Sequence, residues 1–320
     1  MSTRDKLLGA FHGRSQELIS GARLARRLGL SRASVWKQIK ALQKEGFPVE
    51  SVERAGYRWR GAADLSLAFF KPPKTGASRG MAHYHLSASS TQDLAKLGAA
   101  QGLPEGHLWL AEIQKAGRGR LGRRWDSGFG GLWFSLLIRP AVPPAQIPGL
   151  ALVCAWTLAR TVRKMTGADV RLKWPNDLVV LHQGRWKKAA GILTDMSAEV
   201  DRTHWVVLGI GVNVHNPLTG PLGSIAVSLQ SLCSRPIERA SLLARFLKNF
   251  YASYRTFQKD GFERFRAPYW KLYRAPDGWV RLRTSQGALA GWARGIDGSG
   301  ALIIESRRET HHLTEGEIVL

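Results

Sequence analysis

The sequence predicts a multidomain α+β protein with an N-terminal winged helix-turn-helix, a central α/β domain on a mixed sheet and a small C-terminal β-barrel. Short helical segments and a basic hairpin pattern fill the first 60 residues. From about 81 to 270, β-rich runs alternate with helical ones, and the tail from about 275 alternates apolar and polar residues. The 320 residues suffice for two or three domains with their own cores. The predicted domains are 1–63, 64–272 and 273–320.

Three short helices are expected near the N-terminus, because apolar residues recur there at helical spacing and glycines follow each run. Ser31 is a good cap for the third helix, and two short strands about a turn near residues 54–56 complete the pattern. The apolar faces are Leu7, Leu8 and Phe11, then Leu24, Ala25 and Leu28, then Val35, Ile39 and Leu42, and the stops are Gly13, Gly29 and Gly46.

The third helix and the hairpin carry donors suited to phosphates and base edges in a major groove. Two helices joined by a tight turn and followed by a basic hairpin are typical of a winged helix that binds DNA. A solvated helix face would be equally polar, so a vestigial or protein-binding role remains open. The candidate DNA-binding residues are Ser31, Arg32, Ser34, Lys37, Gln38 and Arg54.

The net charge points to a polyanionic partner. The chain has 47 Lys and Arg against 24 Asp and Glu, a formal charge of +23. This balance favours nucleic acid, nucleotide phosphates or acidic protein surfaces. The alternative is that it reflects only an arginine-rich, GC-rich proteome.

A cytoplasmic location is expected. The N-terminal residues lack the unbroken apolar core of a signal peptide. The longest apolar stretch, 147–158, contains Pro148 and is shorter than the roughly 20 residues of a spanning helix. Cys154 and Cys233 lack the spacing of a zinc site or a disulfide framework.

The central region predicts strands at HLWLAEIQ, GLWFSLLIRP, VRLKWPN, AAGILTDMS and THWVVLGIGVNV, and a long buried helix at IPGLALVCAWTLARTVRKMTG. A second helix, SLLARFLKNFYASYRTF, is expected to be the last one. Beyond it, turns at 286–287 and 297–298 separate short alternating strands, which favours a small barrel.

The segment GRGRLGRRW, residues 117–125, is the densest chemical signal. Glycines allow the backbone to approach an anion closely, and arginines offer forked donors to carboxylates or phosphates. Trp125 is placed to stack on a flat base. By itself the segment would also fit an RNA-binding arginine-glycine loop or an exposed turn.

Three further motifs are weaker alone. KWPND, residues 173–177, places Asn176 and Asp177 at a rigid strand end, although a plain Asx turn would look the same. Lys188 precedes a strand expected to open at Gly191, where its cation would reach the same pocket as the arginines. GIGVN, residues 209–213, ends an apolar strand in small residues and an amide, and would also fit tight sheet packing.

Together, in this order, the motifs resemble those of bacterial biotin protein ligases. The resemblance covers nearly the whole chain, from the Ser90-Thr91 pair through Glu112 to Arg123, KWPND, Lys188 to Leu193 and GIGVN, to the terminal ARGIDGSGAL. With the winged helix, the chain is similar to the bifunctional ligase-repressor type named for the biotin operon. The resemblance implies a ligase domain related to class II synthetases and an SH3-like barrel.

The resemblance implies an ATP-dependent reaction in two steps. Biotin and ATP form biotinyl-5′-AMP, and a lysine of the biotin carboxyl carrier protein of acetyl-CoA carboxylase then takes the biotin. Mg²⁺ would be carried by ATP rather than by a fixed protein site. The expected catalytic residues are Arg118, Arg120, Lys188 and Asp177, the last to orient or deprotonate the incoming amine.

Biotin would be held by Ser90, Thr91, Gln92, Gln114, Gly117, Arg118, Gly119, Arg120 and Lys188. ATP and the adenylate would be held by Arg118, Arg120, Arg123, Trp125, Asn176, Lys188 and Asn213. Two departures from the family pattern stand out. Gln92 replaces the usual Asn, and the loop at 178–187 is longer than usual.

The glycine-rich loop is expected to order on the adenylate, and a two-fold dimer of the ligand-bound protein would present two winged helices to operator DNA. The alternatives are a monofunctional ligase whose winged helix binds no operator, a sensor-only repressor and a lipoate-protein ligase. The last does not usually pair GRGRxGR with KWPND.

Overall fold

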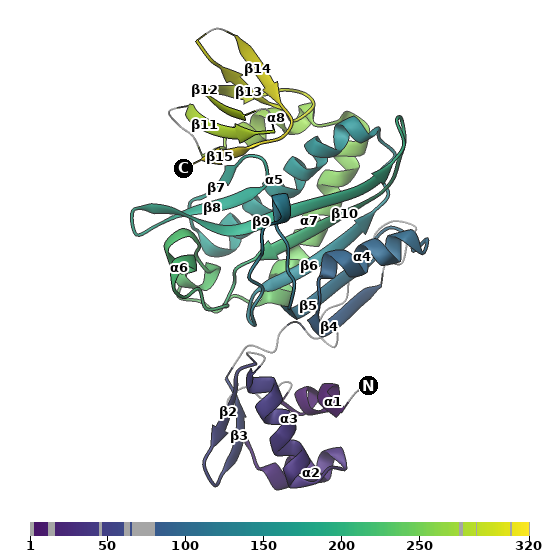
Figure 1. Ribbon diagram of the computed structural model, residues 1–320, viewed down its shortest axis with the longest axis vertical. Coiled ribbons are helices and arrows are strands. Elements are labelled where there is room, and N and C mark those ends of the chain that lie inside the picture. The colour runs from purple at the N-terminus through teal and green to yellow at the C-terminus, as the bar shows by residue number, and fades with distance from the viewer. Residues whose placement is uncertain are drawn as a thin grey trace.

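The computed structural model describes residues 3–11, 17–44, 47–60, 65, 81–274, 278–285, 287–307 and 309–319. Within them three sheets follow one another along the chain, with three, seven and five strands. Figure 1 shows the N-terminal unit at one end of the molecule, the seven-stranded sheet in the middle and the five-stranded sheet at the other end. This arrangement confirms the predicted fold class. The boundaries at 63 and 272 stay predictions, and residue 63 lies outside the described residues.

The N-terminal unit contains three helices and a small antiparallel sheet, with bounds α1 Thr3–Phe11, β1 Leu18–Ile19, α2 Gly21–Leu28, α3 Arg32–Lys44, β2 Val49–Val52 and β3 Gly56–Trp59. Local signals set the helix ends. The Ser20 hydroxyl accepts the amide of Arg23, and Gly29 ends α2 in the left-handed region at φ 68°. The Ser31 hydroxyl accepts the amide of Ser34 at 3.1 Å, as expected of a cap. The predicted stops at Gly13 and Gly46 lie outside the described residues.

The central sheet has strand order β4-β5-β6-β10-β9-β8-β7. β4 and β5 are parallel and are joined through α4, whereas the other neighbours are antiparallel. The bounds are β4 Ala82–Ala88, α4 Thr91–Ala100, β5 Leu108–Gln114, β6 Leu132–Ile138, α5 Ile147–Thr166, β7 Val170–Lys173, β8 Asp177–His182, β9 Arg185–Ala198, β10 Thr203–Val212, α6 Pro221–Ile225, α7 Arg239–Asp260 and α8 Glu263–Trp270.

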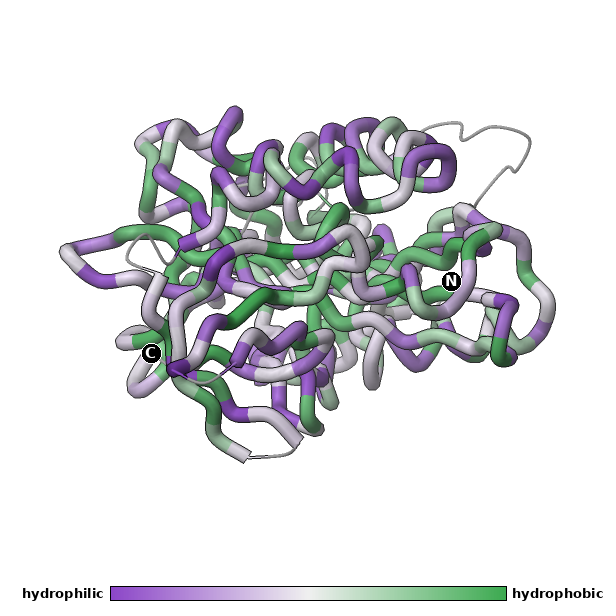
Figure 2. The backbone as a smooth tube through the Cα atoms, turned by 90° about the horizontal axis from the view of Figure 1, so that it is seen from above, coloured by the Kyte–Doolittle hydropathy of each residue, from purple (hydrophilic) through white to green (hydrophobic). Residues whose placement is uncertain are grey.

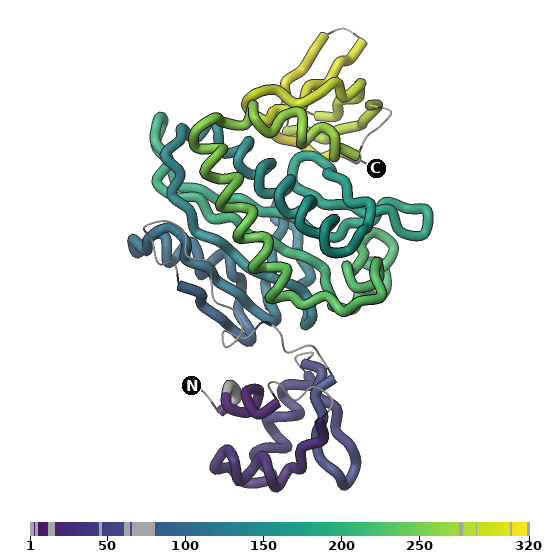
Figure 3. The backbone as a smooth tube through the Cα atoms, turned by 180° about the vertical axis from the view of Figure 1, so that it is seen from behind, coloured from purple at the N-terminus to yellow at the C-terminus, as the bar shows by residue number. Residues whose placement is uncertain are grey.

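Alternation along the strands sorts side chains between two layers. Even-numbered residues of β6 and β10, such as Leu136 and Leu208, join the main core under α5 and α7, which Figure 3 shows crossing one face of the sheet. Leu137 and Val207 face the other way and pack beneath α4. Figure 2 shows apolar colouring through the middle of the molecule and polar colouring toward its outer segments.

The C-terminal unit is the predicted small β-structure, an antiparallel sheet in the order β14-β13-β12-β11-β15. Its bounds are β11 Trp279–Thr284, β12 Gly287–Ile296, β13 Leu302–Glu305, β14 Thr310–Leu313 and β15 Glu317–Val319. Its inner residues, including Val280 and Leu282, belong to the same apolar cluster as the central sheet. The indole of the buried Trp174 also donates to the carbonyl of Gly300 at 3.3 Å, so the two units share a packed boundary.

Two expectations about the elements were wrong. Helices do not stop after α7, because α8 follows the turn at Gly261, where φ is +65°. The segment 178–187 is not a loop but the hairpin of β8 and β9, with Gln183 and Gly184 at positive φ in its turn. Consequently Asp177 and Lys188 both lie within strands.

Helix α5 is long and apolar enough to cross a membrane by composition alone. However, 67% of that window is buried within the protein. Leu150, Val153 and Leu158 are among its core residues. The helix is therefore part of the folded core.

Candidate functional site

A cavity of about 440 Å³ opens on the α4 side of the central sheet. Small residues make room for it at the positions where β6, β10 and β9 face this side: Ser135, Gly209, Gly211 and Gly191. The N-terminus of α4, the loop before β6, the β7–β8 turn and the edge of the C-terminal sheet surround it. The volume falls within the usual range for sites that bind small molecules and cofactors.

The glycine-arginine segment forms a narrow hairpin beside this cavity. The amide of Trp125 donates to the carbonyl of Gly117 at 2.9 Å, and that of Gly119 donates to Arg123 at 2.7 Å. The tip contains Leu121 at φ 56° and Gly122 at φ 71°, a left-handed pair that closes the turn. Only glycine fits at position 117, because a Cβ there would lie 2.5 Å from the Ser127 hydroxyl.

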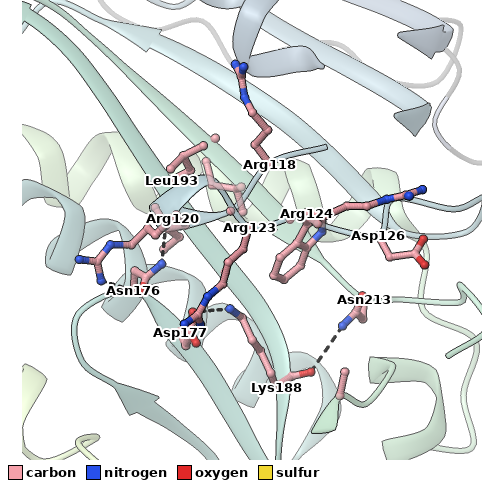
Figure 4. A pocket seen from close by; sticks show the side chains of 18 of the residues that line it. Arg118, Arg120, Arg123, Arg124, Asp126, Asn176, Asp177, Lys188, Leu193 and Asn213 are labelled. Carbon is pink, nitrogen blue, oxygen red and sulfur yellow. Dashed lines mark hydrogen bonds and ion pairs between the residues drawn. The ribbon is translucent and has the colours of Figure 1, made fainter. Parts of the chain in front are cut away.

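The arginines of this hairpin diverge (Figure 4). Arg118 reaches toward α4 and pairs with Asp93, whereas Arg120 donates to Oδ1 of Asn176 at 3.4 Å. Arg120 also donates to the carbonyl of Gly316, and Arg123 forms a two-pronged ion pair with Glu317. The turn before β15 therefore holds the hairpin over the cavity.

Lys188 lies at the centre of the site. Its ammonium is 2.7 Å from Oδ1 of Asp177 and 4.9 Å from the centre of the Trp125 ring. A shift in the β8–β9 register next to Val179 sets the direction of Lys188 along the strand. The indole of Trp125 lies over two glycines, because a Cβ at Gly211 would be 2.7 Å from its nitrogen.

The opposite end of the cavity is neutral and polar. Oε1 of Gln114 accepts the Thr91 amide at 2.8 Å and lies 3.0 Å from the Thr91 hydroxyl. The amide nitrogen of Gln114 donates to Ser127 at 2.9 Å. Ser90 caps α4 and is buried with Thr91. These groups match hydrogen-bonding ligand atoms rather than a charge.

The electrostatic field of the site favours anions. Among the described residues that line it, six basic side chains face three carboxylates: Arg118, Arg120, Arg123, Arg124, Lys173 and Lys188 against Asp126, Asp177 and Glu317. Burial lowers the pKa of Lys173, with Asp177 opposing the shift, and burial likewise lowers the pKa of Arg120. A partly dehydrated cluster of cations is stabilised electrostatically when an anion enters it.

Comparison with known proteins gives two family matches. The family model "Biotin/lipoate A/B protein ligase family" matches residues 84–213, and an HTH domain model matches 11–58. The bifunctional ligase/repressor BirA of Bacillus subtilis (strain 168) is 37% identical over 99% of this chain and 98% of its own length. Its counterpart in Escherichia coli (strain K12) is 30% identical over 95% and 93%.

The chain belongs to the family of bifunctional ligase/repressors. The fold agrees with a solved biotin protein ligase from Aquifex aeolicus in complex with biotin and ATP. That chain superposes with a TM-score of 0.64 at 24% identity, covering 76% of this chain and 98% of its own. At that identity the match supports the fold alone.

Nearly all ligand-site residues expected from the family resemblance line the one cavity. Gly117 is the exception, since it is buried in the stem of the hairpin behind the lining. Gln92 lines the cavity, but its amide is already engaged. It donates to Asp195 at 3.2 Å and to the Val207 carbonyl at 3.1 Å, and it accepts from Ser135 at 3.0 Å.

Several lining residues were missed by the sequence analysis. Lys173 belongs to the KWPND motif but was treated only as part of a strand. Glu317 and Ile318 come from the C-terminal unit, whose sequence shows no ligand motif. Asp93 does not line the cavity, but its pairing with Arg118 was also missed because the two residues are 25 positions apart. A search for carboxylates able to pair with the arginines would have offered too many candidates.

Five of the six candidate DNA-binding residues lie at the start of α3 or within it. Ser31, Arg32, Ser34 and Lys37 are exposed and Gln38 is half-buried. Arg54 is exposed at the turn between β2 and β3, at φ 54°. Trp36, which is 56% exposed on the same helix, was not expected there. An aromatic residue among cations is suited to a nucleic-acid surface, although the pattern alone gave no reason to place it outside the core.

Proposed function

We propose that this protein joins biotin to a carrier-protein lysine through biotinyl-5′-AMP and acts as a biotin-responsive repressor. The observation that carries the ligase proposal is the division of one cavity into two ends. Arg120, Lys188 and Trp125 form an anion-binding, aromatic end, and Ser90 with Thr91 forms a neutral polar end. A carboxylic acid with a hydrogen-bonding ring would bridge them to ATP.

In the first step the biotin carboxylate attacks the α-phosphate of ATP, and pyrophosphate leaves. Two anions must meet, so fixed positive charge lowers the barrier. Lys188 and Arg120 supply this charge from within the cavity, with Arg118 and Arg123 at its edge. Trp125, held against Gly211, offers a face to the adenine, and Asn176 and Asn213 assist on the nucleotide side.

In the second step the carrier lysine amine attacks the acyl carbonyl, and AMP leaves with the bonding electrons. The amine must be neutral when it attacks, so a nearby carboxylate that accepts its proton is useful. Asp177 is 2.7 Å from the Lys188 ammonium and faces the cavity. We assign it the orientation or deprotonation of the incoming amine.

Mg²⁺ enters this site with the triphosphate. No group of three or more His, Cys, Asp or Glu side chains suited to a metal occurs within the described part of the chain. The donor set is mainly cationic, which fits a phosphate ligand better than a bare cation. Mg²⁺ usually binds through substrate phosphates, so it would be carried here by ATP rather than by a fixed protein site.

The repressor proposal rests on α3 and the wing. Ser31, Arg32, Ser34, Lys37 and Gln38 would enter a major groove, with Arg54 at the flanking backbone. Adenylate-bound protomers would pair through their central sheets and place two winged helices on an inverted repeat. We assign the DNA-binding, ligase and barrel domains to 1–63, 64–272 and 273–320, and the protein to the cytoplasm.

The ligase proposal is tested by incubating the protein with biotin, Mg-ATP and an apo biotin carboxyl carrier domain, and by measuring the intact mass of the carrier. Biotin on the carrier is expected with the wild type. Lys188→Ala and Arg120→Gly should lose most of the rate, since one such donor is worth about 3 kcal/mol in the barrier. Lys164→Ala, an exposed lysine at the end of α5, is the matched control. Absence of both transfer and pyrophosphate release would leave a sensor-only repressor.

The repressor proposal needs its own test. A duplex selected from a random pool with biotin and ATP present should bind more tightly than random DNA over a salt series. Lys37→Ala should weaken both and lower the salt dependence by about one ion. Sedimentation with and without biotin plus ATP should show ligand-dependent dimers. A monomer with no preference for the selected duplex would indicate a monofunctional ligase.

A further inference from the structure

The Gln92 side chain crosses the floor of the cavity without presenting its amide to the cavity. It leaves the first turn of α4, passes Gly209 and ends at Asp195 on β9. Gln92 is 4% exposed and Ser135 is wholly buried. A Cβ at position 209 would lie 2.3 Å from Oε1 of Gln92, so the glycine of GIGVN makes this path possible.

Chemistry fixes which way the amide points. The nitrogen lies 3.2 Å from a carboxylate oxygen of Asp195 and 3.1 Å from the carbonyl oxygen of Val207. Turning the amide over would place Oε1 against two oxygens that can only accept, and burial would make this costly. Oε1 therefore faces Ser135, at 3.0 Å.

The orientation of the Gln92 amide then decides which hydroxyl donates and which accepts in the next hydrogen bonds. An amide oxygen cannot donate, so the single Ser135 proton goes to Gln92. Ser135 is then left to accept from Thr91, whose hydroxyl lies 2.9 Å away. Oε1 of Gln114 accepts both the Thr91 backbone amide at 2.8 Å and the Thr91 hydroxyl at 3.0 Å, so this oxygen and Ser135 share the hydroxyl proton. The Thr91 hydroxyl proton is thus committed inside the protein, and its lone pairs face the cavity.

Ser90 has the opposite polarity. Its hydroxyl oxygen accepts the Gln92 amide at 3.2 Å, which leaves its proton available to the ligand. The neutral end of the cavity therefore presents a donor at Ser90 and an acceptor at Thr91. A cyclic urea offers the matching pair, a carbonyl oxygen beside a ring NH.

We propose that Gln92 is a positioning residue that fixes Thr91 as an acceptor for a ring NH of the ligand, through Ser135 and without touching the ligand itself. The inference rests on the proposed function, because it takes the ureido ring of biotin as the ligand. It replaces the expectation that Gln92 binds biotin directly.

The test compares three ligands by calorimetry: biotin and the two analogues in which one or the other ring NH is replaced by oxygen. Oxygen has the same size but accepts instead of donating. The wild type should reject the analogue whose oxygen meets Thr91 by about 100-fold or more, because two acceptors then face each other. In Gln92→Met the Ser135 hydroxyl is released to donate to Thr91, and the Thr91 proton can then turn from its internal acceptors to the ligand, so this rejection should shrink at least about tenfold.

Ser135→Ala breaks the same chain at its middle and keeps the test decisive if Gln92→Met fails to fold. It should lose the same discrimination, and the double variant should lose no more. Gln230→Met is the matched control, because Gln230 also donates to two carbonyls and accepts one amide, but away from the cavity lining. Its discrimination should equal that of the wild type.

A role in stability alone would weaken biotin and its analogues equally. Equal weakening, or an unchanged ratio in both Gln92→Met and Ser135→Ala, would overturn the proposal. Failure of the wild type to bind biotin would instead overturn the proposed function.

Discussion

Arg239 donates a hydrogen bond to Oε2 of Glu112 at 2.8 Å, and both side chains are buried. The same guanidinium donates to the carbonyl of Gly131 and lies over the ring of Phe129. The pair joins the start of α7 to β5. It therefore fixes the helix layer to the sheet next to the segment that leads into the ligand cavity.

Removing one member of this pair should be costly. Arg239→Met leaves the Glu112 carboxylate buried without its cation, and breaking a buried pair costs about 3–5 kcal/mol. Urea unfolding of the central domain measures the loss. Arg266→Met, from an exposed pair with Glu263, should change it by less than about 1 kcal/mol. Similar losses for both variants would show that the buried pair has no special role.

Phe129 joins the winged helix to the central domain. Its ring lies 5.6 Å from that of Phe47 and 5.4 Å from that of Trp59, both in the N-terminal core. Phe129→Ala should loosen this contact and lower the melting temperature of the N-terminal unit by about 5–10 °C, as expected for the loss of one or two kcal/mol from a small domain. Calorimetry should resolve the two transitions. An unchanged N-terminal transition would exclude the coupling, and Phe129→Leu should show a smaller effect.

Much of the fold was predictable because local sequence patterns determine its helices and strands. Short β-rich apolar runs predicted the strands β5, β6 and β10, Gly29 predicted the end of α2 and Ser31 predicted the start of α3. The cavity lining was predictable because family motifs mark it. Contacts between distant residues were not. Nothing near Arg239 indicates burial, since Glu112 lies 127 residues away, and Glu317 reaches Arg123 across 194 residues.

The Asp297 carboxylate makes the C-terminal unit sensitive to acid. Burial opposes its ionisation, but hydrogen bonds from His312, Ser299 and Ala301 outweigh this and lower its pKa from 3.8 to about 2. A depressed pKa in the folded state stabilises the protein above the unfolded pKa and loses that contribution as the pH falls from about 4 to about 2.

Asp297→Ala should therefore destabilise the C-terminal unit by about 2 kcal/mol at pH 6. The difference from the wild type should shrink as the pH falls through this window. Urea unfolding at about pH 6, 4 and 2 would check the trend. A difference that is constant with pH would mean that the carboxylate charge contributes nothing.

Glu317 holds the glycine-arginine hairpin against the C-terminal sheet. Its two-pronged pair with Arg123, together with the Gly316 carbonyl at Arg120, ties the hairpin to the C-terminal sheet. Both Glu317 and a phosphate would compete for Arg123, so the carboxylate occupies the place that an anionic ligand would take. Arg123 is more than half exposed, so salt should weaken this contact.

Glu317→Ala should free the hairpin and raise the rate at which trypsin cleaves at residues 118–124, by about threefold or more, because an exposed ion pair contributes up to about 1 kcal/mol. Glu263→Ala, an exposed acid on α8, should leave the rate unchanged. Biotin with ATP should protect both variants if the ligand orders the hairpin. A rate equal to that of the wild type would mean that the hairpin keeps its position through its own backbone hydrogen bonds, and Glu317 would then be only a neighbour of the site.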